Sequence, residues 1–373
     1  MGAMHSYQPL RIAGIGRETA EAVVVSLDVP PALAADFRFV PGQHIPVRAV
    51  IDGAEQRRTY SICCGPGEDG LRIAIKRVAG GLFSNWANDV LKAGDTLEAA
   101  PPAGRFVLPD GAGEARHVLA FAAGVGITPI LAMVKQALAR EPQTRVTLLY
   151  GNRGPDTILF AEELEDLKDR HLGRFTLLHT LSHGEEGGAP LLEGRITADK
   201  VRALAGRLFE PAEVAHVFLC GPGAMIKDVR GALLGLGMPA RKVHFELFAP
   251  ASPSPAPAPH PSPRPPPGQA FPAEGRREGV AGAEVVAILD GIRHRFTVPP
   301  GGRVVDAALA AGVRVPFSCK GGMCCTCRAR LIEGEARMAL NYSLEPWEIE
   351  RGFILTCQAV PTSERLVLDY DQM

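Results

Sequence analysis

The chain has 373 residues, which is too long for one typical core and predicts two or three domains. Hydrophobic residues make up 46% and charged residues 22%, and the formal net charge of -1 argues against nucleic acid or an anionic membrane as a partner. No N-terminal segment joins a basic region to an apolar core, so we expect a cytoplasmic protein with reduced cysteines.

Short β-rich runs with turn signals fill residues 1–111, and their spacing predicts a small antiparallel β-barrel. The runs are "EAVVVSLDV", "HIPVRAVID", "RTYSICC", "LRIAIKRV" and "DTLEAAPP". In "RTYS", Tyr60 can stack on a flavin ring and Arg58 can meet a phosphate. An edge strand with a surface arginine is the alternative for this motif.

The segment "GGLFSNW" indicates a helix start inside the barrel region. Ser84 is the expected N-cap of a helix that runs to about Leu91, and Gly80 and Gly81 precede it. Because a helix start presents unpaired N–H groups, this segment is a candidate anion site.

Strands alternate with helices over residues 112–248, which predicts a parallel, doubly wound α/β sheet. The expected strands are "HVLAFAAG", "RVTLLYG", "RFTLLHTLS", "AHVFLCG" and "KVHFELF". The expected helices are "PILAMVKQALAR", "FAEELEDLKDR", "ITADKVRALA" and one from Pro222. The apolar stretch "VLAFAAGVGITPILAMV" approaches the length of a membrane span, but its central glycines and proline favour strand, turn and helix.

Two glycine turns follow strands of this sheet and indicate a dinucleotide site. In "GVGITP", Gly124 and Gly126 allow a tight turn, and Thr128 is expected to cap the helix. The motif lacks the third glycine of the usual pattern, so a plain strand-to-helix turn is the alternative. A second turn, "CGPGAM", contains Gly221 after Cys220, whose thiol is either a nicotinamide contact or a small buried side chain.

A proline-rich segment separates these regions from the rest of the chain. Residues 249–282 include "APASPSPAPAPHPSPRPPPG", which favours extended polyproline II and predicts a semi-rigid tether. A proline-rich ligand for a partner protein is the competing interpretation.

Four cysteines crowd the stretch "SCKGGMCCTC". Cys319, Cys324 and Cys327 have the C-x4-C-x2-C spacing of plant-type 2Fe-2S sites, and Cys357 is the one later cysteine that can serve as the fourth ligand. Cys325 is then extra. A zinc site usually shows two short cysteine pairs, and only one is present, so iron is favoured.

Residues 283–373 around these cysteines have the pattern of an α+β, β-grasp ferredoxin domain. "EVVAILDG" and "IRHRFTVPP" predict a hairpin through Asp290-Gly291, and the helix "VVDAALAAG" follows. The strands "CRARLIEG" and "ERLVLDYD" come after the cysteine loop.

The motifs "RTYS", "GGLFSNW", "GVGITP", "LLYGNR" and "CGPGAM" resemble, in this order, those of the ferredoxin–NADP reductase family. The last domain resembles plant-type ferredoxins. Together with "CKGGMCCTCRARLIEGEARMALNYSLEPWEIERGFILTCQA", the domain order resembles the reductase components of phenylacetyl-CoA epoxidases.

The resemblance implies a role for each matching residue. It places the FAD pyrophosphate on Arg58, the flavin ring on Tyr60 and the flavin N5 near Ser61. The remaining implied contacts are Gly81 and Ser84 to the FAD phosphates, Gly124, Gly126 and Thr128 to the nicotinamide nucleotide, and Glu246 and Phe248 to the flavin.

Nucleotide preference is predicted from the residues after "RVTLLYG". Arg153 suits the 2′-phosphate of NADPH, whereas an acidic residue would suit the ribose of NADH. Asp156 lies nearby, so NADH remains an alternative.

These features predict an oxidoreductase that passes electrons from NAD(P)H through FAD and a 2Fe-2S cluster to an oxygenase, and the resemblance implies that this is the oxygenase component of a multisubunit di-iron monooxygenase in phenylacetate degradation. A reductase for a different oxygenase is one alternative. A tethered ferredoxin carrier without catalysis is another, and bound FAD with NAD(P)H-driven reduction would exclude it.

Overall fold

The computed structural model describes residues 7–65, 67–68, 70–111, 113–183, 191–248, 282–344 and 346–372. Contacts within the chain divide it into an N-terminal unit that ends at Phe248 and a C-terminal unit that follows it. The predicted proline-rich tether, 249–282, lies outside the described residues except for Gly282.

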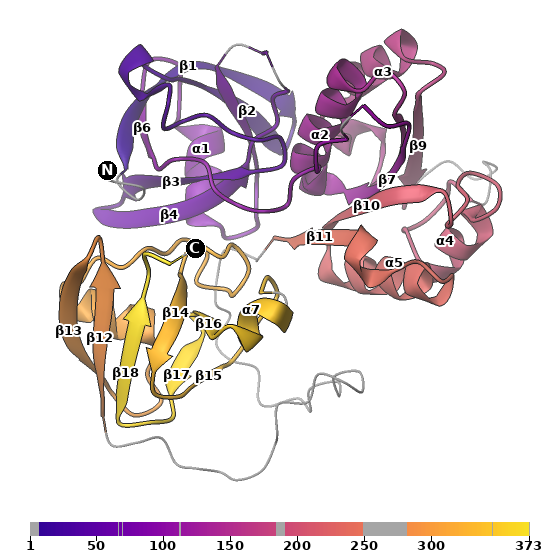
Figure 1. The fold of residues 1–373 in the computed structure, drawn as a ribbon. Helices are drawn as coiled ribbons and strands as arrows, with labels where there is room; N and C mark the ends of the chain where they lie inside the picture. Colours follow the sequence, from indigo (N-terminus) through magenta and orange to yellow (C-terminus); the bar gives the residue numbers. More distant parts are fainter. Residues whose placement is uncertain are drawn as a thin grey trace. The chain divides into compact units, whose positions relative to one another are not determined.

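Six antiparallel strands and one helix begin the N-terminal unit (Figure 1). They are β1 (Gln8–Thr19), β2 (Ala22–Asp28), β3 (His44–Ile51), β4 (Ala54–Ser61), β5 (Leu71–Lys76), α1 (Leu82–Asp89) and β6 (Thr96–Ala99). The strand order is β4-β3-β6-β1-β2-β5, and a bridge between Ile62 and Ile73 joins the two edges. In β2, Val23, Val25 and Leu27 alternate into the core, as a half-buried strand requires. The predicted barrel is therefore confirmed, with β1 as a strand that the sequence patterns do not predict.

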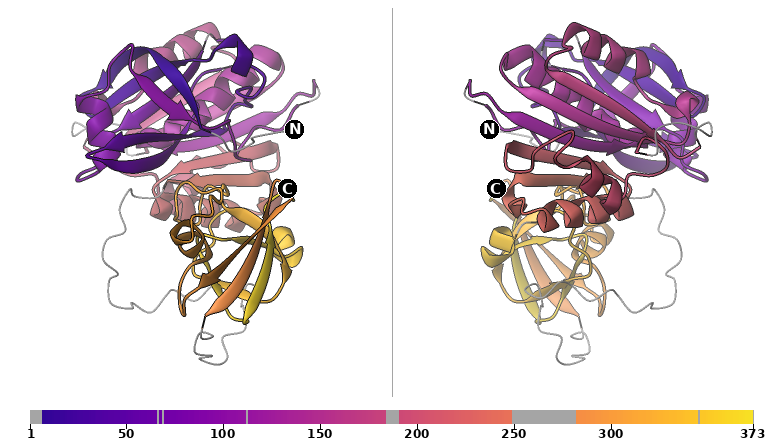
Figure 2. Two further views of the ribbon diagram at one scale, coloured as in Figure 1. Left: turned by 90° about the vertical axis from the view of Figure 1, so that its left-hand side faces the viewer. Right: turned by 90° about the vertical axis from the view of Figure 1, so that its right-hand side faces the viewer.

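A five-stranded parallel sheet forms the rest of this unit, in the order β11-β10-β7-β8-β9. Its elements are β7 (His117–Ala123), α2 (Ile127–Arg140), β8 (Arg145–Asn152), α3 (Ala161–Arg170), β9 (Phe175–Leu181), α4 (Ala198–Leu204), β10 (Val214–Gly221), α5 (Gly223–Gly235) and β11 (Val243–Leu247). Helices α2 and α3 pack on one face of the sheet and α4 and α5 on the other (Figure 2), which confirms the doubly wound architecture.

The two glycine turns lie side by side because β7 and β10 are neighbouring strands. The direction of strand succession reverses between them, and in doubly wound sheets ligands bind at the carboxyl ends of the strands at this point. The apolar stretch around the first turn is strand β7, the turn and α2. In the described part of the chain, no helix is long and apolar enough to cross a membrane.

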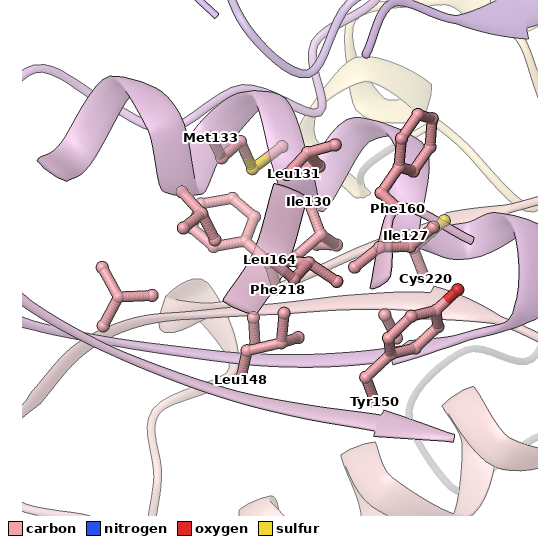
Figure 3. Packing of buried hydrophobic residues seen from close by; sticks show 14 of the residues in the cluster. Ile127, Ile130, Leu131, Met133, Leu148, Tyr150, Phe160, Leu164, Phe218 and Cys220 are labelled. Carbon is pink, nitrogen blue, oxygen red and sulfur yellow. The ribbon is translucent and has the colours of Figure 1, made fainter. Parts of the chain in front are cut away.

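A shared apolar cluster holds the barrel against the parallel sheet. Phe106 of the barrel packs against Phe218 of β10, with ring centroids 5.5 Å apart, and both belong to a cluster with Met133 of α2. Figure 3 shows Met133 and Phe218 in this cluster. A group of buried charges adds to this contact. Lys135 of α2, 6% exposed, pairs with Glu68 of the barrel (Nζ–Oε1 2.8 Å) and with Glu163 of α3. Both domains thus fix the position of α2, the helix that follows the first glycine turn.

The C-terminal unit contains a mixed sheet with the order β13-β12-β18-β14-β16, in which β12 and β18 are parallel, and a separate antiparallel pair of β15 and β17. Its elements are β12 (Ala283–Leu289), β13 (Ile292–Val298), α6 (Val304–Ala310), β14 (Arg328–Glu333), β15 (Ala336–Met338), α7 (Pro346–Glu350), β16 (Phe353–Leu355), β17 (Ala359–Pro361) and β18 (Arg365–Asp369). The expected hairpin turns at Asp290 (φ +50°) and Gly291 (φ +75°), both left-handed as a type I′ turn demands. Helix α6 buries Val304, Val305 and Ala308 in the core cluster of this unit, and the β-grasp prediction is confirmed.

Candidate functional site: two glycine turns and a four-cysteine loop

In the first glycine turn, the backbone of Gly124 is open and that of Gly126 lies close to the second glycine turn. Gly124 has φ +53°, and a Cβ added there would meet nothing within 4 Å, so its backbone faces open space. A Cβ on Gly126 would lie 2.2 Å from the carbonyl oxygen of Cys220, so only glycine fits between the two turns. The Tyr150 hydroxyl donates to the Gly124 oxygen (3.0 Å) and accepts from Leu159 N–H (3.2 Å), which holds the turn in place.

Both predicted helix caps are wrong. Gly126 is the N-cap of α2, and the Thr128 hydroxyl inside the helix donates to the Val125 oxygen (3.0 Å). Gly81 is the N-cap of α1, which ends at Asp89. The left-handed turn at Gly80 (φ +70°) starts that helix earlier than expected.

The Ser84 hydroxyl consequently lies in the first turn of α1, where it accepts from Val78 N–H (3.1 Å) and donates to the Gly81 oxygen (3.3 Å). Because the hydroxyl already has these two internal partners, a phosphate contact through Ser84 stays a prediction.

Four polar side chains from four strands meet where the barrel contacts the sheet. The Ser61 hydroxyl of β4 donates to Glu246 Oε2 of β11 at 3.3 Å. Glu246 is also the register partner of Cys220 on β10. His44 Nδ1 of β3 lies 3.5 Å from Glu246 Oε1, and His44 Nε2 is buried without a partner among the described residues. The structure thus brings together Ser61, Cys220 and Glu246 as expected, and adds His44.

Sequence patterns give no signal for His44. Its neighbour Ser61 stands opposite it in the β3–β4 register, but Glu246 is about two hundred residues further along the chain. The polar group exists only because the end of β11 contacts the barrel. Burial raises the pKa of the Cys220 thiol well above its usual range, so this cysteine stays protonated at neutral pH.

The expected flavin-side residues lie nearby in the barrel. Tyr60 is half-buried, its ring centroid is 5.9 Å from that of Phe83, and burial raises the pKa of its hydroxyl. Arg58 is partly buried and donates to the Arg57 oxygen (2.6 Å). Phe248 packs at the edge of the cluster shared by barrel and sheet. Arg153 follows β8, which lies two strands away from β10, so it does not belong to this polar group.

The four predicted cluster cysteines form two pairs in the C-terminal unit. The Cys324 thiol donates a hydrogen bond to Cys319 and lowers the pKa of Cys319 to about 5. The Cys327 thiol likewise donates to Cys357 and lowers the pKa of Cys357. Among the described residues, no group of three or more His, Cys, Asp or Glu side chains is placed to surround a single metal ion.

Backbone N–H groups face these thiols. Gly321 N–H donates to Cys319 Sγ (3.3 Å), and Gly322 N–H contributes to lowering the pKa of Cys357. To turn its N–H groups toward the thiols, the loop adopts left-handed backbone conformations at Lys320 (φ +50°), Gly322 (φ +75°) and Cys325 (φ +54°). The donor set of four thiols surrounded by amides therefore fits a 2Fe-2S cluster.

Three family models match the chain. The oxidoreductase FAD-binding domain matches residues 15–108, the oxidoreductase NAD-binding domain matches 121–231, and the 2Fe-2S iron-sulfur cluster binding domain matches 287–362. The chain therefore contains domains for FAD, a nicotinamide nucleotide and a 2Fe-2S cluster.

Full-length relatives have the same organisation. The chain is 37% identical over 371 residues to a subunit of the 1,2-phenylacetyl-CoA epoxidase of Escherichia coli (strain K12), with 99% of each chain covered. It is 34% identical to the ferredoxin reductase component of 3-ketosteroid-9-alpha-monooxygenase of Rhodococcus rhodochrous, over 97% of this chain and 96% of the relative. The structure of phthalate dioxygenase reductase, with electron transfer from pyridine nucleotides to 2Fe-2S, superimposes with a TM-score of 0.59 and 27% identity, over 99% of this chain and 100% of that one.

Proposed function

Because the chain belongs to the family of reductase components that serve oxygenases through FAD and a 2Fe-2S cluster, we propose that its electron acceptor is the di-iron oxygenase component of a phenylacetyl-CoA epoxidase. The observation that carries this proposal is the 37% identity to an epoxidase subunit over 99% of both chains. When bound, FAD would supply the change from two-electron hydride chemistry to single-electron transfer, and a 2Fe-2S cluster would supply one-electron transfer to the acceptor.

The polar group at the barrel would bind and orient the reacting rings. The half-buried Tyr60 ring would support the flavin, and Arg58 would bind its pyrophosphate. Ser61 can hold a proton between its hydroxyl and Glu246, with which it already forms a hydrogen bond (3.3 Å). Cys220 is buried and protonated, so it would offer the nicotinamide a small neutral surface rather than a nucleophile.

The glycine turns would bind the nicotinamide nucleotide. Gly124 leaves its backbone open, Gly126 permits the contact with the Cys220 oxygen, and Gly221 begins the second turn. Arg153 is exposed after β8 and would pair with a 2′-phosphate, which favours NADPH. Replacing Arg153 with alanine should then raise the Michaelis constant for NADPH more than that for NADH, and equal changes would contradict the assignment.

The residues that would hold the cluster are Cys319, Cys324, Cys327 and Cys357. None of the eight cysteines, all within the described residues, forms a disulfide. Thiols kept reduced for iron are expected in the cytoplasm, which is where we place the reaction.

The proposal is tested by reconstitution with purified oxygenase components. The reductase should support phenylacetyl-CoA epoxidation with NADPH, and cytochrome c reduction in the same preparation shows whether the reductase itself is competent. Competent reductase that drives a 3-ketosteroid monooxygenase but not the epoxidase would overturn the proposed partner. If the intact, iron-loaded chain did not reduce cytochrome c, the proposed transfer from NADPH through FAD and the cluster would be contradicted.

A further inference from the structure

Gln358, which directly follows Cys357, is a buried amide in contact with the cysteine loop. Its side chain is 1% exposed. The Nε2 atom donates to the backbone oxygen of Lys320 at 2.7 Å and lies 3.7 Å from Cys357 Sγ. An amide nitrogen carries two N–H groups, so one can serve each of these acceptors.

The orientation of this amide follows from its surroundings. The reverse orientation would set its oxygen against the Lys320 oxygen, two acceptors with no proton between them. In the observed orientation, Gln358 Oε1 is buried without a hydrogen-bond partner in the described part of the chain. Burying an unpaired carbonyl oxygen costs free energy that an apolar side chain of equal size would avoid. The two N–H donors are therefore what this position requires.

The first N–H acts on the loop that faces the thiols. Lys320 has a left-handed backbone (φ +50°), which is uncommon for a residue with a side chain. Gly322, two residues later, also has positive φ, and a Cβ on it would lie 3.1 Å from Gln358 Cγ. Gln358 therefore packs beneath the loop whose Gly321 N–H donates to Cys319 Sγ.

We propose that Gln358 is a positioning residue of the cluster site. One N–H holds the 320–324 loop through the Lys320 oxygen, and the other donates to Cys357 Sγ. Reduction adds negative charge to the cluster and its thiolates, and a donor to sulfur favours that state and raises the reduction potential. The inference rests on the ligand set of the proposed function.

The test compares two methionine substitutions in the full-length, cofactor-loaded protein. Gln358→Met keeps the length of the side chain and removes both donors. Gln372→Met is the matched control, because Gln372 belongs to the same unit but hydrogen-bonds Asp369 (2.8 Å) and Arg330 (2.6 Å) instead of the loop. Redox titration followed by electron paramagnetic resonance gives the midpoint potential of each cluster, and absorbance gives that of the flavin.

In Gln358→Met, the equilibrium constant for cluster reduction should fall about three- to tenfold, the net worth of one typical hydrogen bond. A tenfold fall equals about 59 mV for a one-electron couple. The cluster should also bleach faster in air because the loop is less restrained. The flavin potential and every property of Gln372→Met should match the unmodified protein. An unchanged cluster potential in Gln358→Met would overturn the inference.

A second measurement does not depend on the Gln358→Met protein. Glutamine labelled with 15N in the side-chain amide should give a 15N coupling to the reduced cluster in pulsed electron paramagnetic resonance, and the Gln372→Met protein should keep it. Absence of that coupling would refute the contact even if Gln358→Met fails to assemble a cluster. An unmodified chain that contains no iron would instead refute the cluster site of the proposed function, so the two failures are distinguishable.

Discussion

Cys63 of the N-terminal unit and Cys357 of the C-terminal unit are similarly buried but chemically opposite. Cys63 is 0% exposed and Cys357 is 2% exposed. Burial raises the pKa of Cys63 far above its usual range. Cys357 has a lowered pKa, first because the Cys327 thiol donates to it and further through Gly322 N–H and the Gln358 amide.

The contrast shows that hydrogen-bond donors, rather than burial, prepare a thiol to bind metal. Cys63 Sγ faces the Arg72 carbonyl oxygen (3.3 Å), an acceptor that can only stabilise the protonated form. Cys319 Sγ faces Gly321 N–H, which stabilises the thiolate that iron binds. Cys319 and Cys357 thus have surroundings that favour the thiolate, whereas the pKa values of their partners Cys324 and Cys327 are raised, because each donates its proton to its partner and is buried.

The largest effect is expected from removing a ligand. Cys327→Ser should reduce bound iron from two atoms per chain to nearly none, because the remaining three thiolates cannot complete both irons. Cys325→Ser is the matched control and should keep the iron, because Cys325 lies outside the C-x4-C-x2-C pattern that defines the ligand set. Iron and sulfide assays of both proteins check this. Iron retained only in Cys327→Ser would mean that Cys325, and not Cys327, is a ligand.

A smaller but sharper difference is expected in alkylation of the iron-free chain. With its pKa near 5, Cys319 is a thiolate at neutral pH, so its rate with iodoacetamide should be flat from pH 6 to 8 and fall below pH 5. An ordinary thiol of pKa about 8.5 would react roughly tenfold faster for each pH unit over that range. Cys63 should not react while the chain is folded. Mass spectrometry of the modified peptides measures both, and a rate for Cys319 that climbs steadily from pH 6 to 8 would contradict the lowered pKa.

The smallest effect is expected from the N-terminal thiols. Cys63→Ala removes a small buried side chain and should lower the free energy of unfolding of its unit by about 1–2 kcal/mol. Flavin and iron content should not change, because neither site uses this thiol. Calorimetry with cofactor assays would show this, and loss of flavin at unchanged stability would give Cys63 a role that the structure does not indicate.

Much of the fold can be predicted from local patterns. The β7–α2 and β10–α5 turns are recognisable because glycine directly follows an apolar strand. Strand β1 is not, because Gly14 and Gly16 interrupt the alternation of "QPLRIAGIGRET". The short strands β15 and β17 have three residues each, too few for a period to appear.

The sites are predictable only where their residues are close in sequence. The C-x4-C-x2-C spacing indicates three ligands directly. The contacts of Glu246 with His44, of Lys135 with Glu68, and of Gln358 with Lys320 each join distant segments. Long-range contacts leave no periodic signal, so neither the place of His44 in the polar group at the barrel nor the support beneath the cysteine loop could be foreseen. The errors at Ser84 and Thr128 arise because preceding glycines, rather than hydroxyl side chains, begin those helices.

The central claim is that one chain passes electrons from the nicotinamide nucleotide through FAD to the cluster. Anaerobic titration with NADPH, followed by absorbance for the flavin and electron paramagnetic resonance for the cluster, tests it directly. We predict flavin reduction together with a reduced-cluster signal that approaches one spin per chain, and flavin reduction without that signal in Cys327→Ser. A fully iron-loaded chain whose flavin is reduced while its cluster stays oxidised would contradict the account.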